Sequence, residues 1–199
     1  MRTPQRSAFG VYAALTSQIT SLAALVAFEE LRGHDLARQI AVFGGDPKAP
    51  GAEAVVGDVT IFAVLVMAVV VTTLMAAAAY VSWLSGTARV GKPTAVAAWL
   101  IPGVNLVAPM VLADQAWRER GKESRLRWLL LLGGWWAAGL TTAWLIAEGH
   151  ATHTNLTGLG LGELTAATVT AVLCAATVWE VSSPRTIRLS SRQAIVVSK

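Results

Sequence analysis

Charged residues and cysteines are both scarce in this sequence of 199 residues. Only 14% of the residues are charged and 54% are hydrophobic, whereas about a quarter of the residues in a soluble domain carry a charge. This shortage of charge argues against a soluble globular protein and favours a membrane protein. The single cysteine, Cys174, excludes an internal disulfide bond and leaves the redox compartment open.

Motifs of familiar enzymes are missing as well. The sequence contains no P-loop, no Rossmann glycine pattern, no haem-attachment motif and no recognisable pairing of a nucleophile with a base. We therefore lean against an enzyme and expect no cofactor. The formal net charge of +4 would suit nucleic acid, but the basic residues form short blocks beside apolar runs and no nucleic-acid-binding motif accompanies them. The expected partners are the lipid bilayer and its anionic headgroups.

Four apolar segments are long enough to cross a membrane. A transmembrane helix needs about 20 mostly apolar residues, and the four segments cover residues 8–28, 59–84, 126–147 and 159–181. Such segments form α-helices because lipid offers the backbone no hydrogen-bonding partners. The predicted fold is therefore an all-α integral membrane protein, a single domain of four transmembrane helices that ends in a basic tail at 182–199.

The first of these segments has an alternative interpretation. Because Arg2 and Arg6 precede it, residues 8–28 resemble a secretory signal peptide. The apolar run is long for a signal peptide and no clear cleavage site follows it, so we favour a retained span. Its polar residues, Gln18 among them, are expected to bond to neighbouring helices. The alternative is that they line a polar pathway.

Basic residues are distributed unevenly between the two sides of the predicted membrane. With four spans and a cytoplasmic N-terminus, thirteen of the sixteen Lys and Arg residues lie inside and three outside. The positive-inside rule then places both termini in the cytoplasm, in an inner or plasma membrane. Trp83, Trp117, Trp128 and Trp179 fall near the inner boundary and Trp144 near the outer one, as expected of an aromatic belt.

Residues 95–117 form a fifth apolar segment whose placement is less direct. No residue from Ala95 to Ala113 is charged, and a five-span arrangement would put twelve basic residues inside and four outside. However, Pro102 and Pro109 lack an N–H group, so each leaves a carbonyl without its helical partner. We therefore favour a proline-broken helix that lies on, or dips into, the cytoplasmic face over a fifth span.

This segment also resembles a known family. Its tryptophans, prolines and asparagine follow the pattern W-x2-P-x2-N-x3-P-x7-W, formed by Trp99, Pro102, Asn105, Pro109 and Trp117. The pattern looks like the core of a bacterial membrane family common in actinobacteria, domain-of-unknown-function family 4328, and the resemblance covers about residues 59–181. It implies a multi-pass membrane architecture. Because the family has no established activity, the resemblance implies no reaction and no substrate.

Two polar residues near or within the spans are candidate functional groups. Asn105 shares one helix face with Pro102 and Pro109; bracing of a neighbouring helix is favoured over coordination of an ion or headgroup. Glu163 lies about one turn into the fourth span, and an ionisable residue inside a membrane helix is a functional candidate. Stabilisation of the helix dipole near an N-terminus is the favoured role for it.

A metal site at the outer face is a further candidate. Glu148, His150 and His153 lie close together in the stretch EGHATH. If the outer ends of the spans meet, they would approach Glu29, Glu30 and His34. Histidine with carboxylate is a zinc-binding combination. The spacing matches no strong zinc motif, so a solvated loop is the favoured interpretation.

Two further patterns concern contacts outside the spans and between them. The small residues Gly133, Gly134, Ala137 and Ala138 permit close helix packing, within the bundle or with a second copy. A basic stretch follows the proline-broken segment and is expected to contact headgroups on the cytoplasmic face. Its basic residues are Arg118, Arg120, Lys122, Arg125 and Arg127.

The sequence leaves three functional hypotheses. The leading one is a non-enzymatic accessory or interaction protein, because few ionisable groups lie within the spans. The second is a small transporter or channel for an ion or small polar solute, for which Gln18, Asn105 and Glu163 are the relevant residues. The third is a metal-binding or enzymatic site at the outer face. The expected protein partner is a second copy or another membrane protein.

Overall fold

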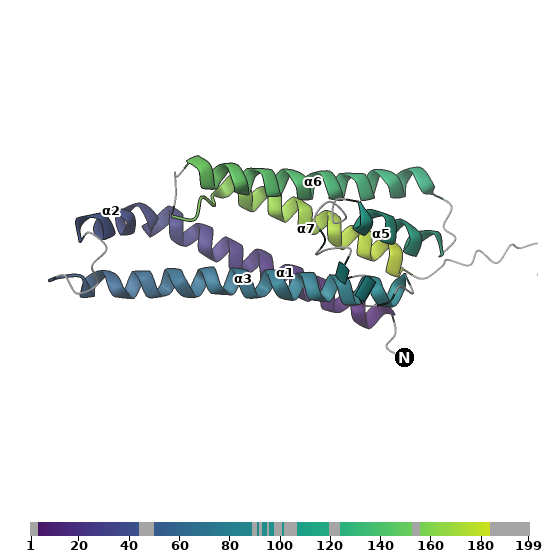
Figure 1. Ribbon diagram of the computed structural model, residues 1–199, viewed down its shortest axis with the longest axis horizontal. Coiled ribbons are helices and arrows are strands. Elements are labelled where there is room, and N and C mark those ends of the chain that lie inside the picture. Colours follow the sequence, from purple (N-terminus) through teal and green to yellow (C-terminus); the bar gives the residue numbers. More distant parts are fainter. Residues whose placement is uncertain are drawn as a thin grey trace, which may run out of the picture.

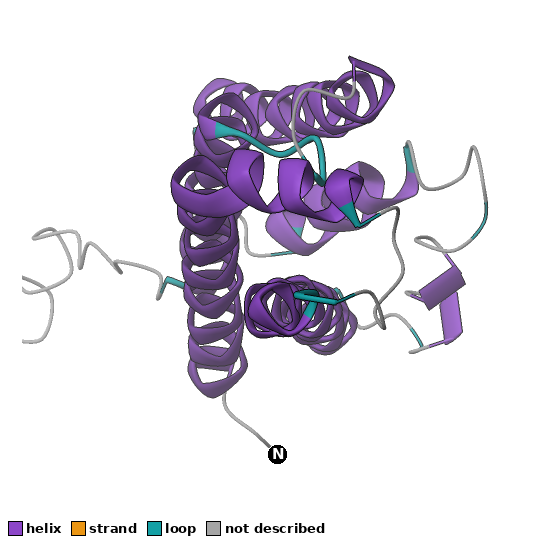
Figure 2. Ribbon diagram, turned by 90° about the vertical axis from the view of Figure 1, so that its left-hand side faces the viewer, coloured by secondary structure: helices purple, strands orange, loops and turns teal. Residues whose placement is uncertain are grey.

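The structure is a computed structural model of the whole chain. It describes residues 4–43, 50–88, 91, 93–94, 96–97, 101, 107–119, 124–152 and 156–183. Every regular element within these residues is a helix (Figures 1 and 2). The prediction of an all-α fold with four long apolar helices and a short helix between the second and the third is confirmed.

The four long helices are α1 (Pro4–Phe28), α3 (Glu53–Thr87), α6 (Arg125–Thr152) and α7 (Leu161–Ser182). By length and composition, each belongs to a segment that is apolar enough to cross a membrane. At 1.5 Å per residue, α7 spans about 33 Å and α3 about 52 Å. The hydrocarbon core of a bilayer is about 30 Å thick, so α3 is long enough to project well beyond it.

The first span is longer than the sequence predicted. The apolar run ends at Phe28, but the helix continues through a π-helical turn, η1 (Glu29–Gly33), into α2 (His34–Val42). The charged residues that begin at Glu29 end the apolar run, but they do not interrupt the backbone helix. Neither proline nor a left-handed glycine interrupts the chain there. Hydropathy alone therefore placed this boundary too early.

α2 and the first turns of α3 form a helical hairpin that projects past the ends of α6 and α7 (Figure 1). Gly51, with φ of 90°, lies in the turn just before α3, a backbone conformation that side chains with a Cβ rarely adopt. Arg32 of η1 lies 3.4 Å from the Asp58 carboxylate of α3 and links the two arms. We call this extremity of the bundle the hairpin end.

At the opposite extremity the helices converge on one hydrophobic core. The short helix α5 (Ala108–Arg118) packs there against α3 and α6. We call this extremity the basic end, because Arg118 and Arg125 lie there. The largest fully buried side chains of its core are two tryptophans and apolar residues of all four long helices: Val11, Trp83, Leu84, Trp128, Leu132, Val178 and Val181.

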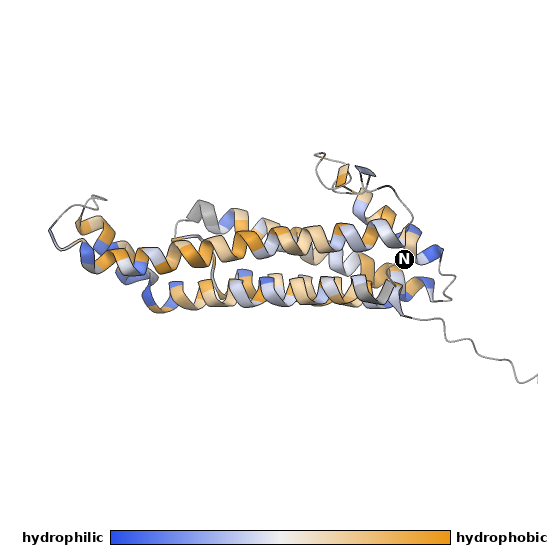
Figure 3. Ribbon diagram, turned by 90° about the horizontal axis from the view of Figure 1, so that it is seen from below, coloured by the Kyte–Doolittle hydropathy of each residue, from blue (hydrophilic) through white to orange (hydrophobic). Residues whose placement is uncertain are grey.

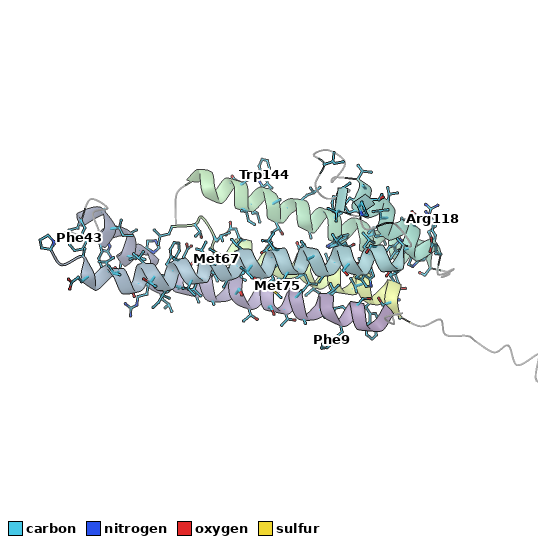
Figure 4. All side chains as sticks on the ribbon, turned by 60° about the horizontal axis from the view of Figure 1, so that its bottom comes forward. Phe9, Phe43, Met67, Met75, Arg118 and Trp144 are labelled. Carbon is cyan, nitrogen blue, oxygen red and sulfur yellow. The ribbon has the colours of Figure 1, made fainter. Side chains whose placement is uncertain are left out.

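Tryptophans of the basic end are core residues rather than members of a headgroup-facing belt. Trp83, Trp117 and Trp128 are each at most 4% exposed. Trp179 and Trp144 have about two-thirds of their surface exposed, and Trp144 points outward (Figure 4). The predicted belt was therefore wrong for the first three, because their large rings fill the space where several helices meet.

Away from the basic end, α3 is held chiefly by α1. Large apolar side chains along α3, including those of Met67 and Met75, point away from the bundle (Figure 4). The long helices are predominantly hydrophobic along their middle stretches (Figure 3). An apolar exposed surface of this kind suits contact with lipid, since an aqueous environment would disfavour it.

α6 and α7 pack closely where small and hydroxyl-bearing residues meet. A Cβ built on Gly139 would lie 3.8 Å from Cγ2 of Thr170, and the hydroxyl groups of Thr142 and Thr170 are 2.9 Å apart and hydrogen-bonded. Gly133 and Gly134 are different, because nothing lies within 4 Å of a Cβ built on either. Close packing between α6 and α7 thus uses Gly139 rather than the predicted glycine pair.

The connection between α6 and α7 passes so close to α6 that one position requires glycine. A Cβ on Gly149 would lie 2.2 Å from the carbonyl oxygen of Gly158, far inside contact distance. We expect Gly149→Ala to lower the free energy of unfolding by about 1–3 kcal/mol, because the backbone must move to admit the methyl group. Thermal unfolding of the purified protein in detergent measures the change.

Gly134→Ala is the matched control, since its methyl group would enter open space on the same helix. We expect this variant to be as stable as the wild type or slightly more stable, because alanine is the better helix former. Equal destabilisation by both substitutions would show that Gly149 makes no close approach.

Candidate functional site

Helix α5 carries the described part of the proline-broken segment. Pro109 is in its first turn, where the missing N–H group removes no helical hydrogen bond. The N–H of Val111 bonds to the carbonyl of Val107, which closes the first turn. Pro109 therefore starts a helix, where the sequence analysis expected it to break one. Trp99, Pro102 and Asn105 lie outside the described residues, so their predicted role stays a prediction.

Asp114 is the centre of the polar contacts on α5. The indole N–H of Trp128 on α6 donates to Oδ1 over 3.0 Å, and Nε of Arg118 donates to Oδ2 over 2.7 Å. A second nitrogen of Arg118 lies 2.6 Å from Oδ2, and one of Arg125 lies 3.7 Å from it. These contacts pair Asp114 with nearby basic residues and fasten α5 to the start of α6.

Two tryptophan rings stack directly beside this carboxylate. The rings of Trp117 and Trp128 are 5.6 Å apart between centroids and nearly parallel, at 3°. Trp128 is thus held by its ring face and by its N–H at once. The Asp114 side chain is only 15% exposed, so water screens its contacts less than it screens a surface ion pair. Indole Nε1 of Trp117 is buried, and no described residue hydrogen-bonds to it.

The predicted headgroup-binding residues lie at this end where they are described. Arg118 and Arg125 keep 61% and 49% of their side-chain surface exposed while they contact Asp114, and Arg127 is exposed. Arg120 and Lys122 lie outside the described residues. Because paired arginines retain free N–H donors, Arg118 and Arg125 can still meet an anionic headgroup.

The two intramembrane polar candidates both have partners inside the protein. The amide nitrogen of Gln18 donates to the hydroxyl of Thr73 on α3 over 3.2 Å. Glu163 occupies the first turn of α7 and accepts a hydrogen bond from the backbone N–H of Gly160 over 2.8 Å. Gln18 therefore bonds α1 to α3, and Glu163 satisfies a backbone donor at a helix start, where negative charge is favourable.

The predicted metal ligands are only partly described. The Glu148 carboxylate accepts a hydrogen bond from the indole of Trp144 over 2.9 Å, whereas the side chain of His150 and all of His153 lie outside the described residues. Across the described part of the chain, no group of three or more His, Cys, Asp or Glu residues is arranged to hold a metal ion. The zinc hypothesis remains a prediction.

The sequence analysis named Glu29 only as a possible neighbour of the metal candidates, whereas the structure buries it in a separate contact. Its residue is 2% exposed, and Oε1 accepts a hydrogen bond from the backbone N–H of Thr157 over 2.9 Å. The two residues are far apart in the sequence, so hydropathy could not reveal this contact. The available sign was an acid that directly follows a long apolar run, because such an acid lies where a span ends.

Comparisons with protein-family models, curated proteins and solved structures find no match to this chain. The resemblance of the Trp99–Trp117 pattern to a family therefore stays a sequence-based prediction. Composition, length and arrangement of the helices indicate a multi-pass membrane protein.

Removing the charge of Asp114 tests the connection between α5 and α6. We expect Asp114→Ala to lower the free energy of unfolding by about 1–3 kcal/mol, because the Trp128 indole loses its acceptor and two arginines lose a counter-ion. Asp114→Asn keeps an acceptor for Trp128 and is expected to lower the free energy of unfolding by less than Asp114→Ala does. Thermal unfolding in detergent gives both values.

Asp35→Asn provides a matched control, because Asp35 pairs with Arg38 on the exposed surface of α2. An exposed pair contributes about 0–1 kcal/mol, so this variant should remain close to the wild type. If Asp35→Asn lowered the free energy of unfolding as much as Asp114→Ala, burial of the Asp114 contacts would not increase their contribution to stability.

Proposed function

We propose that this multi-pass membrane protein acts without catalysis, as an accessory protein that binds another membrane protein or a second copy. The observation that carries the proposal is the engagement of Gln18 and Glu163 inside the protein. These were the described residues that had pointed to a polar pathway through the bundle. Gln18 bonds α1 to α3, and Glu163 bonds the backbone at the start of α7. We therefore assign both residues a structural role rather than a role in solute transport.

Lipid contact at the basic end belongs to the same proposal. Arg118, Arg125 and Arg127 are exposed near the ends of α5 and α6, and each basic residue near an anionic surface contributes about 1 kcal/mol of attraction. The positive-inside rule supports a cytoplasmic position for this end and for both termini, in the plasma membrane. Arg118 directly follows Trp117 and Arg127 directly precedes Trp128, so both arginines adjoin the stacked pair of rings.

A small transporter is the second candidate, and one observation favours it. A groove of about 280 Å³ runs between α1 and α7. Threonine hydroxyl groups of both helices, at Thr16, Thr20 and Thr168, line it together with apolar side chains. The hydroxyl of Thr168 bonds to the backbone carbonyl of Leu164 on its own helix, which reduces its capacity to bind a solute.

Side-specific thiol labelling tests the proposed orientation. In a background with Cys174→Ala, we expect Glu53→Cys at the hairpin end to react with a membrane-impermeant reagent in intact cells. Ser124→Cys at the basic end should react only after lysis. Both positions are exposed, so accessibility within the protein does not separate them. The reverse pattern would overturn the proposed orientation.

Photo-crosslinking in native membranes, paired with flux measurements, tests the accessory function. A photoreactive residue at Met67 should capture one discrete protein species, because Met67 is 62% exposed on a large apolar face of α3. The purified protein in liposomes should move no ion above empty liposomes. Ion flux that Gln18→Leu abolishes would favour the transporter instead, and capture of lipid alone at Met67 would remove support for a protein partner on this face.

A further inference from the structure

Glu29 lies where α1 passes into the π-helical turn η1 at the hairpin end. A π-turn inserts an extra residue into a helix and frequently occurs at functional sites. The turn brings the Glu29 carboxyl group against the connection between α6 and α7, where Oε1 accepts the N–H of Thr157. The same turn sets Gly33 close enough for a Cβ there to lie 3.9 Å from Leu156.

The other carboxyl oxygen of Glu29, Oε2, is buried and has no hydrogen-bond partner among the residues that the structure describes. A carboxylate removed from water is strongly unfavourable unless its charge is compensated. One neutral N–H group on Oε1 does not supply a counter-charge. A buried polar group left unpaired in this way calls for a bound species that supplies the missing interaction.

The charged groups on the surrounding elements do not fill this role. Arg32 pairs with Asp58 of α3, and Glu30 and His34 are exposed on the same helix as Glu29. On α7, Glu163 accepts the N–H of Gly160. The acidic residues Glu53 of α3 and Glu148 of α6 are exposed. Among the described residues, no cationic side chain lies within ion-pair distance of Glu29.

We propose that Oε2 of Glu29 binds a small inorganic cation from the aqueous phase. The cation binds the carboxylate without any covalent change and neutralises the buried charge. This binding site is separate from the proposed accessory function, because it requires no partner protein.

Occupancy of this site is coupled to the α6–α7 connection through the carboxyl group itself. Oε1 holds Thr157 while Oε2 holds the positive charge, so both contacts depend on one side-chain position. The connection has two further anchors, the Glu163–Gly160 bond and the close approach of Gly158 to Gly149. Loss of the bound charge therefore strains a segment that is fixed on its other sides.

Thermal unfolding of the purified full-length protein in detergent tests the cation. Chloride salts of sodium, potassium and calcium are compared with choline chloride at equal ionic strength, for the wild type, Glu29→Gln and Glu30→Gln. Glutamine keeps the acceptor for Thr157 and replaces the charged oxygen with an amide. Glu30→Gln is the matched control, because it removes the adjacent, exposed carboxylate. Infrared spectra of the same samples detect the carbonyl band of a protonated carboxylic acid.

A rise in Tm with one inorganic cation, in the wild type and Glu30→Gln but not in Glu29→Gln, identifies a cation. The proposal is overturned if no cation raises the Tm, or if Glu29→Gln responds as the wild type does. A carboxylic-acid band at neutral pH that Glu29→Gln alone abolishes would also overturn it, because a protonated carboxyl group has no charge for a cation to balance. Should Glu29→Gln fail to fold, Glu29→Asp takes its place, because its shorter side chain keeps the charge and withdraws the oxygens from the site.

Discussion

The contact between Trp128 and its neighbours at the basic end is the interaction on which the bundle depends. Trp128 stacks on Trp117 of α5 and donates its indole N–H to Asp114, so a single side chain joins α5 to α6. Trp83 extends the same core from α3 and donates its N–H to Ser182 at the end of α7.

The sequence predicted the four helices because their physical cause is local. A long apolar run must satisfy its own backbone hydrogen bonds in lipid. The segment 59–84 therefore predicts α3 from its own residues alone. The same logic placed the end of the first helix too early, at Phe28, because the helix continues through charged residues to Val42. Long-range contacts, such as Glu29 with Thr157, depend on packing and leave no periodic pattern.

The candidate sites also differ in whether their contacts are close along the chain or depend on long-range packing. The pairing of Asp114 with arginines four and eleven positions away was predictable, because those residues are close along the chain. Gln18 and Glu163, for which structural roles were favoured over a polar pathway, bond to Thr73 of α3 and to the backbone at the start of α7. Among the described residues, Glu29 combines a buried carboxyl group with an oxygen that has no hydrogen-bond partner, which makes the hairpin end chemically distinctive.

Accessibility of spin labels along α3 in a bilayer tests the central claim most directly, namely that α3 crosses the membrane and presents its apolar face to lipid. We predict that labels at Met67 and Met75 are accessible to molecular oxygen and shielded from a water-soluble nickel chelate. A label at Glu53 should show the reverse, since it lies at the start of α3 in the hairpin end. Access of the nickel chelate to Met67 would contradict the account, because a transmembrane α3 leaves no water beside that residue.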